Sequence, residues 1–454
     1  MMESNTQNQV IANGMRLTEI GLIPNDWTVL TLDECTTKVG SGKTPTGGAT
    51  VYVDSGRPFI RSQNIQWGRL DLSDVAYITE KVHKTFVGSE LKENDVLLNI
   101  TGASIGRCTL ADSRISGGNV NQHVCIIRTN NKILVPKLLV ELINSSLGQI
   151  QIDSNQAGGN REGLNFAQIR QLKFAVPQNI IEQTAIANAL SDVDALISEL
   201  EKLIAKKQAI KTATMQQLLT GKKRLPEFAK NEDGTAKVYK KTELGEIPED
   251  WQSLSLGSDA VLKARIGWQA LTTKEYQTSG DFFLVTGTDF DAGLVKWERC
   301  FHVSEWRYKQ DTNIQLKEGD VLVTKDGTIG KVGYVPKLTK PATLNSGVFV
   351  IRPKRESFEP RFLFYILTSR LFDDFITRIT AGSTITHLYQ KDFVNFEFFA
   401  PEKSEQIAIA TILSDMDSDI QALEQRLSKT RQIKQGMMQE LLTGKTRLVK
   451  PESK

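Results

Sequence analysis

Residues 191–204 read SDVDALISELEKLI, and residues 414–427 read SDMDSDIQALEQRL. In and just before each stretch, large apolar side chains follow one another at alternating steps of four and three residues. This spacing puts them on one face of an α-helix and is typical of a coiled-coil seam. The seam residues are Ile186, Leu190, Val193, Ile197, Leu200 and Ile204 in the first stretch and Ile409, Leu413, Met416, Ile420, Leu423 and Leu427 in the second. The sequence therefore predicts two long helices, over residues 180–219 and 403–442.

The two helical stretches belong to a repeat that runs through the whole chain. TEIGLIPNDW at residues 18–27 returns as TELGEIPEDW at 242–251, and LKENDVLLNITGASIG at 91–106 returns as LKEGDVLVTKDGTIG at 316–330. MQQLLTGKKRL at 215–225 returns as MQELLTGKTRL at 438–448. The chain is thus one unit of about 220 residues used twice, which fixes its domain organisation.

Each unit has a globular part followed by its helix. Before the helix, short apolar runs alternate with glycine, proline and asparagine, which indicates the strands of a mixed domain. We predict an α+β fold, with two similar mixed α/β domains separated by two long antiparallel helices that form a coiled coil, related by an internal pseudo-two-fold. The predicted segments are residues 1–15 (N-terminal segment), 16–177 (first domain), 178–241 (central helix and linker), 242–401 (second domain) and 402–454 (C-terminal helix and tail).

The helix lengths favour pairing between the helices. About forty residues at 1.5 Å each give a rod of roughly 60 Å. Such a rod is not expected to bury its stripe on its own globule, and each exposed large apolar side chain would forgo roughly 1.5–3 kcal/mol. The two stripes should therefore bury each other, with the chain ends close together. Packing of both stripes on another chain in a dimer is the alternative.

The composition excludes several classes of protein. Of 454 residues, 40% are hydrophobic and 24% charged, which fits a soluble globular chain. The polar start MMESNTQNQV and the absence of a long apolar run predict a cytoplasmic protein with no membrane association. Four scattered cysteines without a CxxC, and four histidines without ligand spacing, predict no metal site. The net charge of +3 permits a nucleic-acid partner without requiring one.

Two similar domains on a stiff spacer resemble the way dimeric proteins read two half-sites on duplex DNA. Because the two copies have diverged, the site would be split and asymmetric. The sequence is similar to the specificity subunits of type I restriction-modification systems over nearly its whole length. The motifs that carry this resemblance are GxIPxxW at residues 21–27 and 245–251, the DVL-type strand with its glycine turn in both copies, and the two LLTGK helix ends.

The resemblance implies a non-catalytic subunit whose two target-recognition domains each read one half of a bipartite double-stranded DNA site. It also implies partners: two modification subunits, which are adenine methyltransferases, and restriction subunits with motor and nuclease activity. S-adenosylmethionine and ATP are then expected on these partners, and no cofactor on this chain. The chain contains no Pro-Pro, which the base-holding turn of an adenine methyltransferase would need.

One motif needs separate treatment. Residues 40–44 read GSGKT, like the end of a phosphate-binding P-loop, but Thr37 stands where that pattern needs its first glycine. The second copy lacks the motif. A nucleotide site, and an enzyme acting through it, are therefore disfavoured. A coiled-coil scaffold that presents two protein-binding domains stays open as an alternative function.

Polar side chains in the predicted loops are the candidates for DNA contacts, since amide and guanidinium groups match base edges and positive charge suits phosphates. In the first copy they are Lys43, Thr44, Arg61, Gln63, Asn64, Arg107, Asn119, Gln122, His123, Asn160 and Arg161; in the second they are Arg265, Gln269, Thr286, Thr288, Lys325, Lys331, Ser346, Thr384 and His387. The competing interpretation is that such side chains are solvated or cap turns. Asn121 and Asn345 recur in both copies, which points to a structural role.

Overall fold

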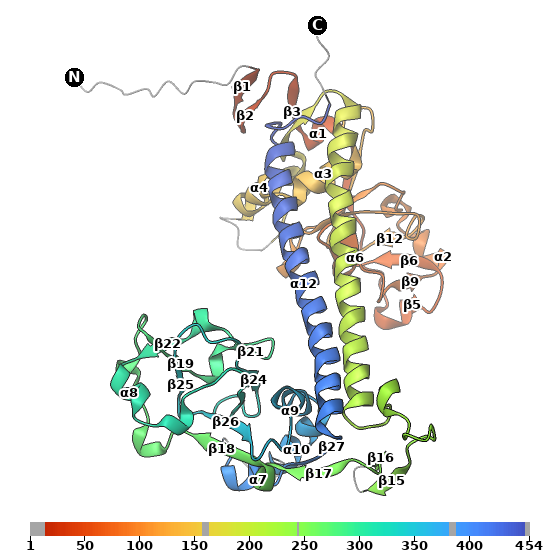
Figure 1. The fold of residues 1–454 in the computed structure, drawn as a ribbon. Helices are drawn as coiled ribbons and strands as arrows, with labels where there is room; N and C mark the ends of the chain where they lie inside the picture. Colours follow the sequence, from red (N-terminus) through yellow and green to blue (C-terminus); the bar gives the residue numbers. More distant parts are fainter. Residues whose placement is uncertain (1–13, 157–162, 243–244, 381–386, 450–454) are drawn as a thin grey trace, which may run out of the picture. The chain divides into compact units, whose positions relative to one another are not determined.

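The computed structural model describes residues 14–156, 163–242, 245–380 and 387–449. The chain forms two compact units: Met1–Lys202 with Gln425–Lys454, here unit 1, and Leu203–Glu424, here unit 2. The long helices α6 (Ile180–Leu218) and α12 (Lys403–Leu441) contribute to both units (Figure 1). Their ends confirm the predicted helix limits to within one residue.

Unit 1 is built on two four-stranded sheets. The first, in the order β11-β10-β13-β4, is antiparallel, and the second, β12-β6-β9-β5, contains the parallel pair β12–β6. The strands of the first sheet are β4 (Thr36–Ser41), β10 (Val96–Asn99), β11 (Cys108–Leu110) and β13 (Val124–Thr129); those of the second are β5 (Tyr52–Val53), β6 (Arg57–Ile60), β9 (Ala76–Ile78) and β12 (Asn119–Val120). Two-stranded pairs join β1 (Met15–Thr18) to β2 (Gly21–Pro24), β3 (Trp27–Thr31) to β14 (Lys173–Pro177), and β7 (Ile65–Gln66) to β8 (Arg69–Leu70). The shorter helices are α1 (Leu32–Cys35), α2 (Glu80–His83), α3 (Pro136–Asn144), α4 (Ser146–Gln156) and α5 (Phe166–Arg170).

Unit 2 repeats this plan with a larger first sheet, in the order β18-β26-β23-β24-β21-β20, and a second sheet β22-β19-β25 whose pair β19–β25 is parallel. The strands are β18 (Ala260–Ala264), β19 (Phe282–Val285), β20 (Phe290–Asp291), β21 (Leu294–Val295), β22 (Phe301–Val303), β23 (Val321–Thr324), β24 (Val332–Tyr334), β25 (Ala342–Leu344) and β26 (Val348–Pro353), with the pairs β15 (Tyr239–Thr242)–β16 (Gly245–Pro248) and β17 (Gln252–Ser255)–β27 (Glu397–Ala400). The shorter helices are α7 (Leu256–Asp259), α8 (Glu305–Lys309), α9 (Pro360–Leu367), α10 (Arg370–Thr380) and α11 (Gln390–Phe393). The matching strand orders confirm two similar α/β domains and the internal repeat.

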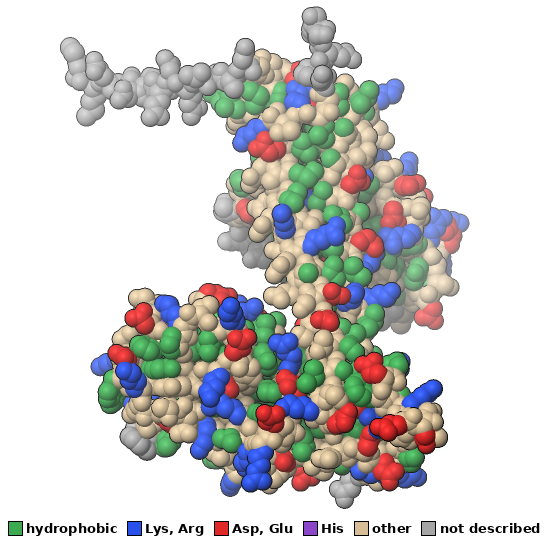
Figure 2. Space-filling view, viewed as in Figure 1, with side chains coloured by type: hydrophobic (Ala, Val, Ile, Leu, Met, Phe, Trp, Pro, Cys, Tyr) green, Lys and Arg blue, Asp and Glu red, His purple; other side chains and the backbone are tan. Residues whose placement is uncertain are grey.

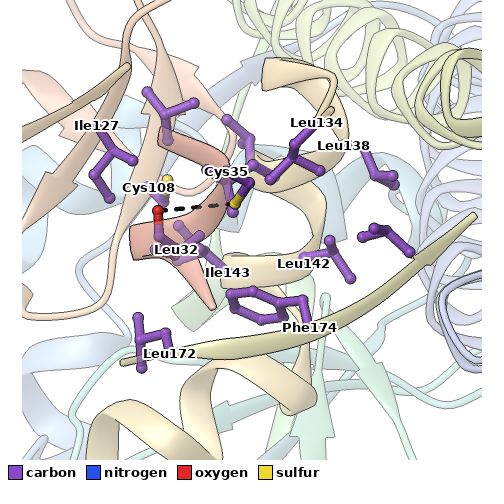
Figure 3. Packing of buried hydrophobic residues seen from close by; sticks show 14 of the residues in the cluster. Leu32, Cys35, Cys108, Ile127, Leu134, Leu138, Leu142, Ile143, Leu172 and Phe174 are labelled. Atoms are coloured by element: carbon purple, nitrogen blue, oxygen red, sulfur yellow. Dashed lines mark hydrogen bonds between the residues drawn. The ribbon is translucent and has the colours of Figure 1, made fainter. Parts of the chain in front are cut away.

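The core of unit 1 lies where α3 packs against the first sheet and α1. Leu138, Leu142 and Ile143 of α3 converge with Leu32 of α1 and Phe174 of β14 (Figure 3). The residues of α3 from Leu138 to Ile143 are all buried, so this helix is covered on every side and not along one face only. The structure also corrects one expectation. Ile186 and Leu190, at the start of the α6 seam, belong to this same core, so the first turns of the helix do pack on their own globule.

The two long helices pair antiparallel within each unit. In unit 1, Arg431 lies 2.6 Å from Glu201 and Lys434 lies 2.6 Å from Asp194, so rising numbers on α12 meet falling numbers on α6. In unit 2, Lys207 lies 3.0 Å from Asp419 and Lys211 pairs with Asp417, which is the same antiparallel sense. Seven seam residues are buried and five are half-buried. The buried ones are Ile186, Leu190, Leu200, Ile204, Ile409, Leu413 and Ile420; the half-buried ones are Val193, Ile197, Met416, Leu423 and Leu427.

The segment after each long helix returns to a globular domain and is fixed there by an arginine. In unit 1, Arg447 donates to Glu182, at the start of α6, and to Asp26 (2.9 and 2.7 Å), near the chain's beginning. In unit 2, Arg224 takes the same place, bonded to Glu405 and to Asp250. Glycines let these segments approach closely: Gly444 has φ +69°, and a Cβ there would lie 2.4 Å from Pro24.

Candidate nucleic-acid interface

In unit 1 the predicted DNA-binding loops gather at the carboxyl ends of β4, β6, β10 and β12. Three hydrogen bonds join them. Thr44, after β4, bonds to Gln122, after β12; Asn99 at the end of β10 donates to the Ser62 carbonyl oxygen after β6 (2.9 Å). His123 bonds through Nδ1 to Thr101, after β10. Loops that lie far apart in the sequence are therefore joined at these strand ends, and the polar side chains they carry form the candidate surface of unit 1.

Several polar side chains at these strand ends are held by their neighbours. Arg61 and Gln63 both bond to Asp74, Gln63 at 2.6 Å, so one carboxylate orders the two side chains. Lys43 is exposed and its Nζ lies 5.5 Å from the centre of the Phe86 ring, a cation–π distance. Arg107 donates to Gln66 at 3.1 Å and is half-buried.

Unit 2 gathers its loops at the equivalent strand ends. Asn345, after β25, donates its backbone N–H to the Val285 carbonyl oxygen at the end of β19 (2.9 Å), and Lys325, after β23, donates its own to Gly347 (2.9 Å). Lys331 donates through Nζ to the carbonyl oxygens of Gly287 (3.2 Å) and Phe290 (2.8 Å). These bonds hold the loops after β19, β23 and β25 close to one another.

The other side chains of this surface differ in what they contact. Thr286 accepts from the Thr288 backbone N–H at 3.4 Å, as a helix cap does. Ser346 is half-buried, and its backbone N–H is held by the Asn345 side chain (2.8 Å). His387 bonds to Asp326. Figure 2 shows that, on the face it draws, lysines and arginines of the second domain alternate with acidic side chains.

Four candidate residues lie inside the units instead of on their surfaces. Asn64, Asn119, Arg265 and Gln269 are exposed by 2%, 0%, 1% and 6%. Asn64 accepts from the Arg61 backbone N–H (3.0 Å) and so caps its turn. Their burial favours a structural role for these four residues. It disfavours the prediction that they contact bases directly. The sequence does not separate the two roles, because amide and guanidinium groups can donate to buried backbone carbonyls as well as to base edges.

Asn160, Arg161 and Thr384 lie outside the described residues. The ends of their segments are placed: Gly163 pairs with Thr101, and His387 pairs with Asp326.

Sequence reasoning missed two kinds of residue. Tyr276 accepts a hydrogen bond from the Asn345 side chain at 2.7 Å, and no pattern in the sequence indicates it. Arg224 and Arg447 were detectable, because each occupies the same position of the LLTGKxRL repeat, but the pattern alone does not show their partners.

Metal ligation and thiol chemistry find little support in the described part of the chain. It contains no group of three or more His, Cys, Asp or Glu side chains arranged to hold a metal ion. Burial raises the pKa of the Cys35 and Cys125 thiols to about 12, so both stay protonated at neutral pH. Residues 42–45, at the end of GSGKT, form a loop, and the motif does not open the α-helix that a P-loop needs. No helix among the described residues is both long and apolar enough to cross a membrane.

Comparison with known proteins now bears on this surface. The family model for the type I restriction modification DNA specificity domain matches twice, at residues 24–212 and 248–434. The chain belongs to this family. The two matches coincide with the two copies of the repeat, and each includes a recognition domain and most of its long helix.

Two relatives and one solved structure extend along nearly the whole chain. The putative type I restriction enzyme MjaX specificity subunit of Methanocaldococcus jannaschii is 26% identical over 95% of this chain and 96% of its own length. The MjaVIII specificity subunit of the same organism is 25% identical over 94% of each chain. The S subunit of a type I restriction-modification system from M. genitalium has the same fold, with a TM-score of 0.60, 16% identity, and coverage of 91% of this chain and 96% of that one. The suspected family is confirmed.

Proposed function

We propose that this chain reads a split, asymmetric DNA site, one half with each recognition domain. One observation carries the proposal: the same strand ends bear the candidate loops in both units, on a repeated scaffold, but with different side chains. After the shared asparagine, Asn121 or Asn345, the loop that follows β12 continues with Gln122 and His123, whereas the loop that follows β25 continues with Ser346 and Gly347. A shared scaffold with different polar groups suits two domains that bind the same polymer at different base sequences.

The proposal extends to partners and cofactors. The chain directs modification subunits, which methylate adenine with S-adenosylmethionine, and ATP-dependent restriction subunits to its site. It contributes recognition and no catalytic group of its own. Family membership supports this division of labour.

The test is coexpression of the chain with a modification subunit that supports methylation, followed by sequencing of methylated adenines. We expect one consensus with two defined halves and an undefined gap. Exchange of residues 36–129 for the equivalent residues of a relative should change one half and leave the other half and the gap as before. Methylation without a split consensus would contradict the proposal.

DNA binding by the assembled complex separates this function from a protein-binding scaffold. Each phosphate contact releases counterions, so several contacts give affinity that falls steeply with salt. We expect a loss of about 10³-fold or more between 50 and 200 mM salt, as for six or more contacts. Affinity that is weak and independent of salt would favour the scaffold.

A further inference from the structure

Each recognition domain has a fully buried polar side chain just before its candidate reading loop. Asn119 in β12 and Thr343 in β25 are equivalent: both are 0% exposed, and both lie in the strand that pairs in parallel with β6 or β19. Each also forms an antiparallel bridge, Asn119 with Glu90 and Thr343 with Gln315. Residues 121–123 and 345–347, which follow, hold candidate DNA contacts.

In the second domain, Arg265 supports this position from inside. Its Nε donates to the Leu344 carbonyl oxygen (2.8 Å), and its terminal nitrogens donate to Thr343 Oγ1 (3.2 Å) and Gln310 Oε1 (3.4 Å). Among the described residues it forms no ion pair, and Arg307 and Glu275 beside it pair with each other. Leu344 is the last residue before the loop, so the planar guanidinium fixes the point from which the loop departs.

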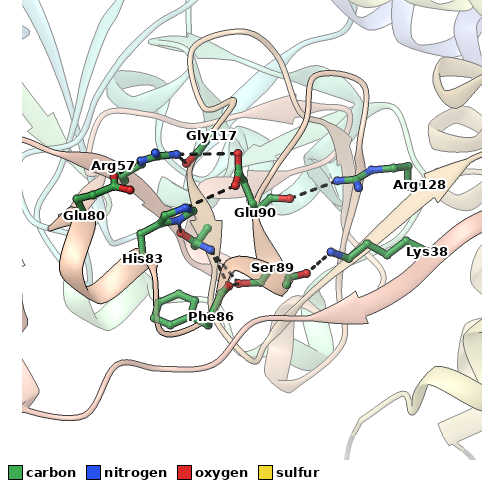
Figure 4. Close-up of polar contacts among 11 residues, drawn as sticks. Lys38, Arg57, Glu80, His83, Phe86, Ser89, Glu90, Gly117 and Arg128 are labelled. Atoms are coloured by element: carbon green, nitrogen blue, oxygen red, sulfur yellow. Dashed lines mark hydrogen bonds and ion pairs between the residues drawn. The ribbon is translucent and has the colours of Figure 1, made fainter.

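In the first domain a different group does this work (Figure 4). His83, 3% exposed, lies with Nδ1 2.7 Å from Asn119 Oδ1. The Asn119 amide nitrogen donates to the Phe86 carbonyl oxygen (3.2 Å) and to Ser89 Oγ (3.0 Å), so its oxygen must accept and His83 Nδ1 must carry a hydrogen. His83 Nε2 lies 3.5 Å from Glu90.

The first cluster reaches the surface through Phe86. The ring of Phe86 is the one that Lys43 covers at 5.5 Å. Asn119 thus joins the strand before residues 121–123 to the segment whose Phe86 ring contacts Lys43, a second candidate residue. A displacement of Asn119 would therefore move both residues 121–123 and the Phe86 ring beside Lys43.

A neighbouring Asp–Arg ion pair is present in both domains, which indicates a role in the shared fold. Asp95 pairs with Arg128 at 2.6 Å, and Asp320 pairs with Arg352 at 2.5 Å, at equivalent positions of the two domains. Both copies keep this pair, whereas the support beneath the loop differs completely between them. Buried polar groups are costly unless satisfied, so two different satisfied clusters at one position indicate two different loop geometries.

We propose that Arg265 and His83 are positioning residues for base recognition, each fixing the strand end that precedes its reading loop and so determining which bases its half-site accepts. This inference rests on the proposed function. Neither side chain needs to touch DNA.

The experiment uses the full chain with its modification subunit and a plasmid library in which each half-site is randomised separately. Arg265→Met and Arg265→Lys test the second domain, and the lysine keeps the charge without the planar fork. His83→Leu and His83→Asn test the first, and the asparagine amide can replace the Nδ1 donor. Arg299→Met, 52% exposed, and Lys84→Gln, also exposed, are the matched controls.

We expect a double dissociation. Both Arg265 variants lower discrimination about five- to hundredfold at one half-site only, the effect of losing one base-pair contact, and His83→Leu does so at the other half-site only. His83→Asn keeps most of the wild-type preference. The unaffected half-site reports that each variant is folded and assembled.

Three results would overturn the inference: unchanged preferences in Arg265→Met and His83→Leu, loss of both half-sites together in the conservative as well as the disruptive variants, or full restoration by Arg265→Lys. A wild-type chain that yields no split consensus is a different outcome, which refutes the proposed function itself.

Discussion

Replacing Arg447 with methionine should destabilise unit 1 through a contact between the two ends of the chain. The Arg447 side chain is 19% exposed and bonds to Glu182, 3% exposed, and to Asp26, 48% exposed. Its guanidinium also lies 5.9 Å from the centre of the Trp27 ring. Methionine keeps the aliphatic packing but leaves the Glu182 carboxylate buried without its cation.

The magnitude follows from this geometry. Breaking a buried ion pair by removing one partner costs about 3–5 kcal/mol, whereas an exposed pair is worth about 0–1 kcal/mol. Because Arg447 keeps some exposure and Asp26 is half exposed, we expect the lower end, about 3 kcal/mol. At a slope of about 2 kcal/mol per molar urea, the unfolding midpoint of unit 1 should fall by about 1.5 M.

The assay is urea unfolding of the full chain followed by tryptophan fluorescence, to which Trp27 beside Arg447 contributes, with Lys445→Met, at an exposed position, as the control. Arg447→Met combined with Glu182→Leu should recover at least 1 kcal/mol relative to the sum of the single changes, because no buried charge is then left alone. Equal effects of Arg447→Met and Lys445→Met, or strictly additive single changes, would refute the reasoning.

Three further predictions concern other contacts. Arg447 donates hydrogen bonds that hold the pKa of Asp26 below its usual value of 3.8, so the contribution of Asp26 to stability is present above that pH and lost as pH falls through the folded pKa. Asp26→Asn should therefore destabilise unit 1 at pH 7 but not at the acid end of a pH series, and a penalty that does not change with pH would contradict this expectation. Gly444→Ala should cost about 2 kcal/mol or more of stability, because Gly444 has φ +69° and a Cβ would meet Pro24. Gly436→Ala, with open space around it in the α12 interior, should instead stabilise by about 0.5–1 kcal/mol in the same melts. The same sign for both variants would argue against the close approach of Gly444 to Pro24. Tyr365→Phe removes a hydroxyl that donates to Asp417 at 2.8 Å and should cost about 1 kcal/mol, measured against Tyr239→Phe at an exposed position, whose equal effect would argue against the bond.

Much of the scaffold was predictable because its signals are local. The four-three spacing from Ile186 to Ile204 fixes the buried face of α6 regardless of what covers it. The repeat of GxIPxxW and LLTGK assigns two copies of one domain, and the antiparallel order follows from the sequence order of globules and helices. What this argument missed is that Ile186 and Leu190 complete their own domain's core, since spacing shows which face is buried but not against what.

The site was predictable as a set of loops but not side chain by side chain. Lys43, Gln63 and Gln122 are exposed at the strand ends, as polar loop residues suggest. Arg265 has a guanidinium group of the kind that contacts DNA, but it is buried beneath the loop, where it donates to a backbone carbonyl. Donor-rich side chains fit either role, so only their surroundings distinguish them.

The sequence by itself determined the twofold repeat, the two long helices with their buried faces, and the loops that hold the candidate residues, because periodicity and repetition are properties of neighbouring positions. Only the tertiary structure decided that Arg447 holds Asp26 and Glu182, and that Arg265 and His83 each contact, from within their own domain, the strand that precedes a candidate loop. These contacts join segments tens to hundreds of residues apart, and their energies depend on burial and distance, which exist only once the chain has folded.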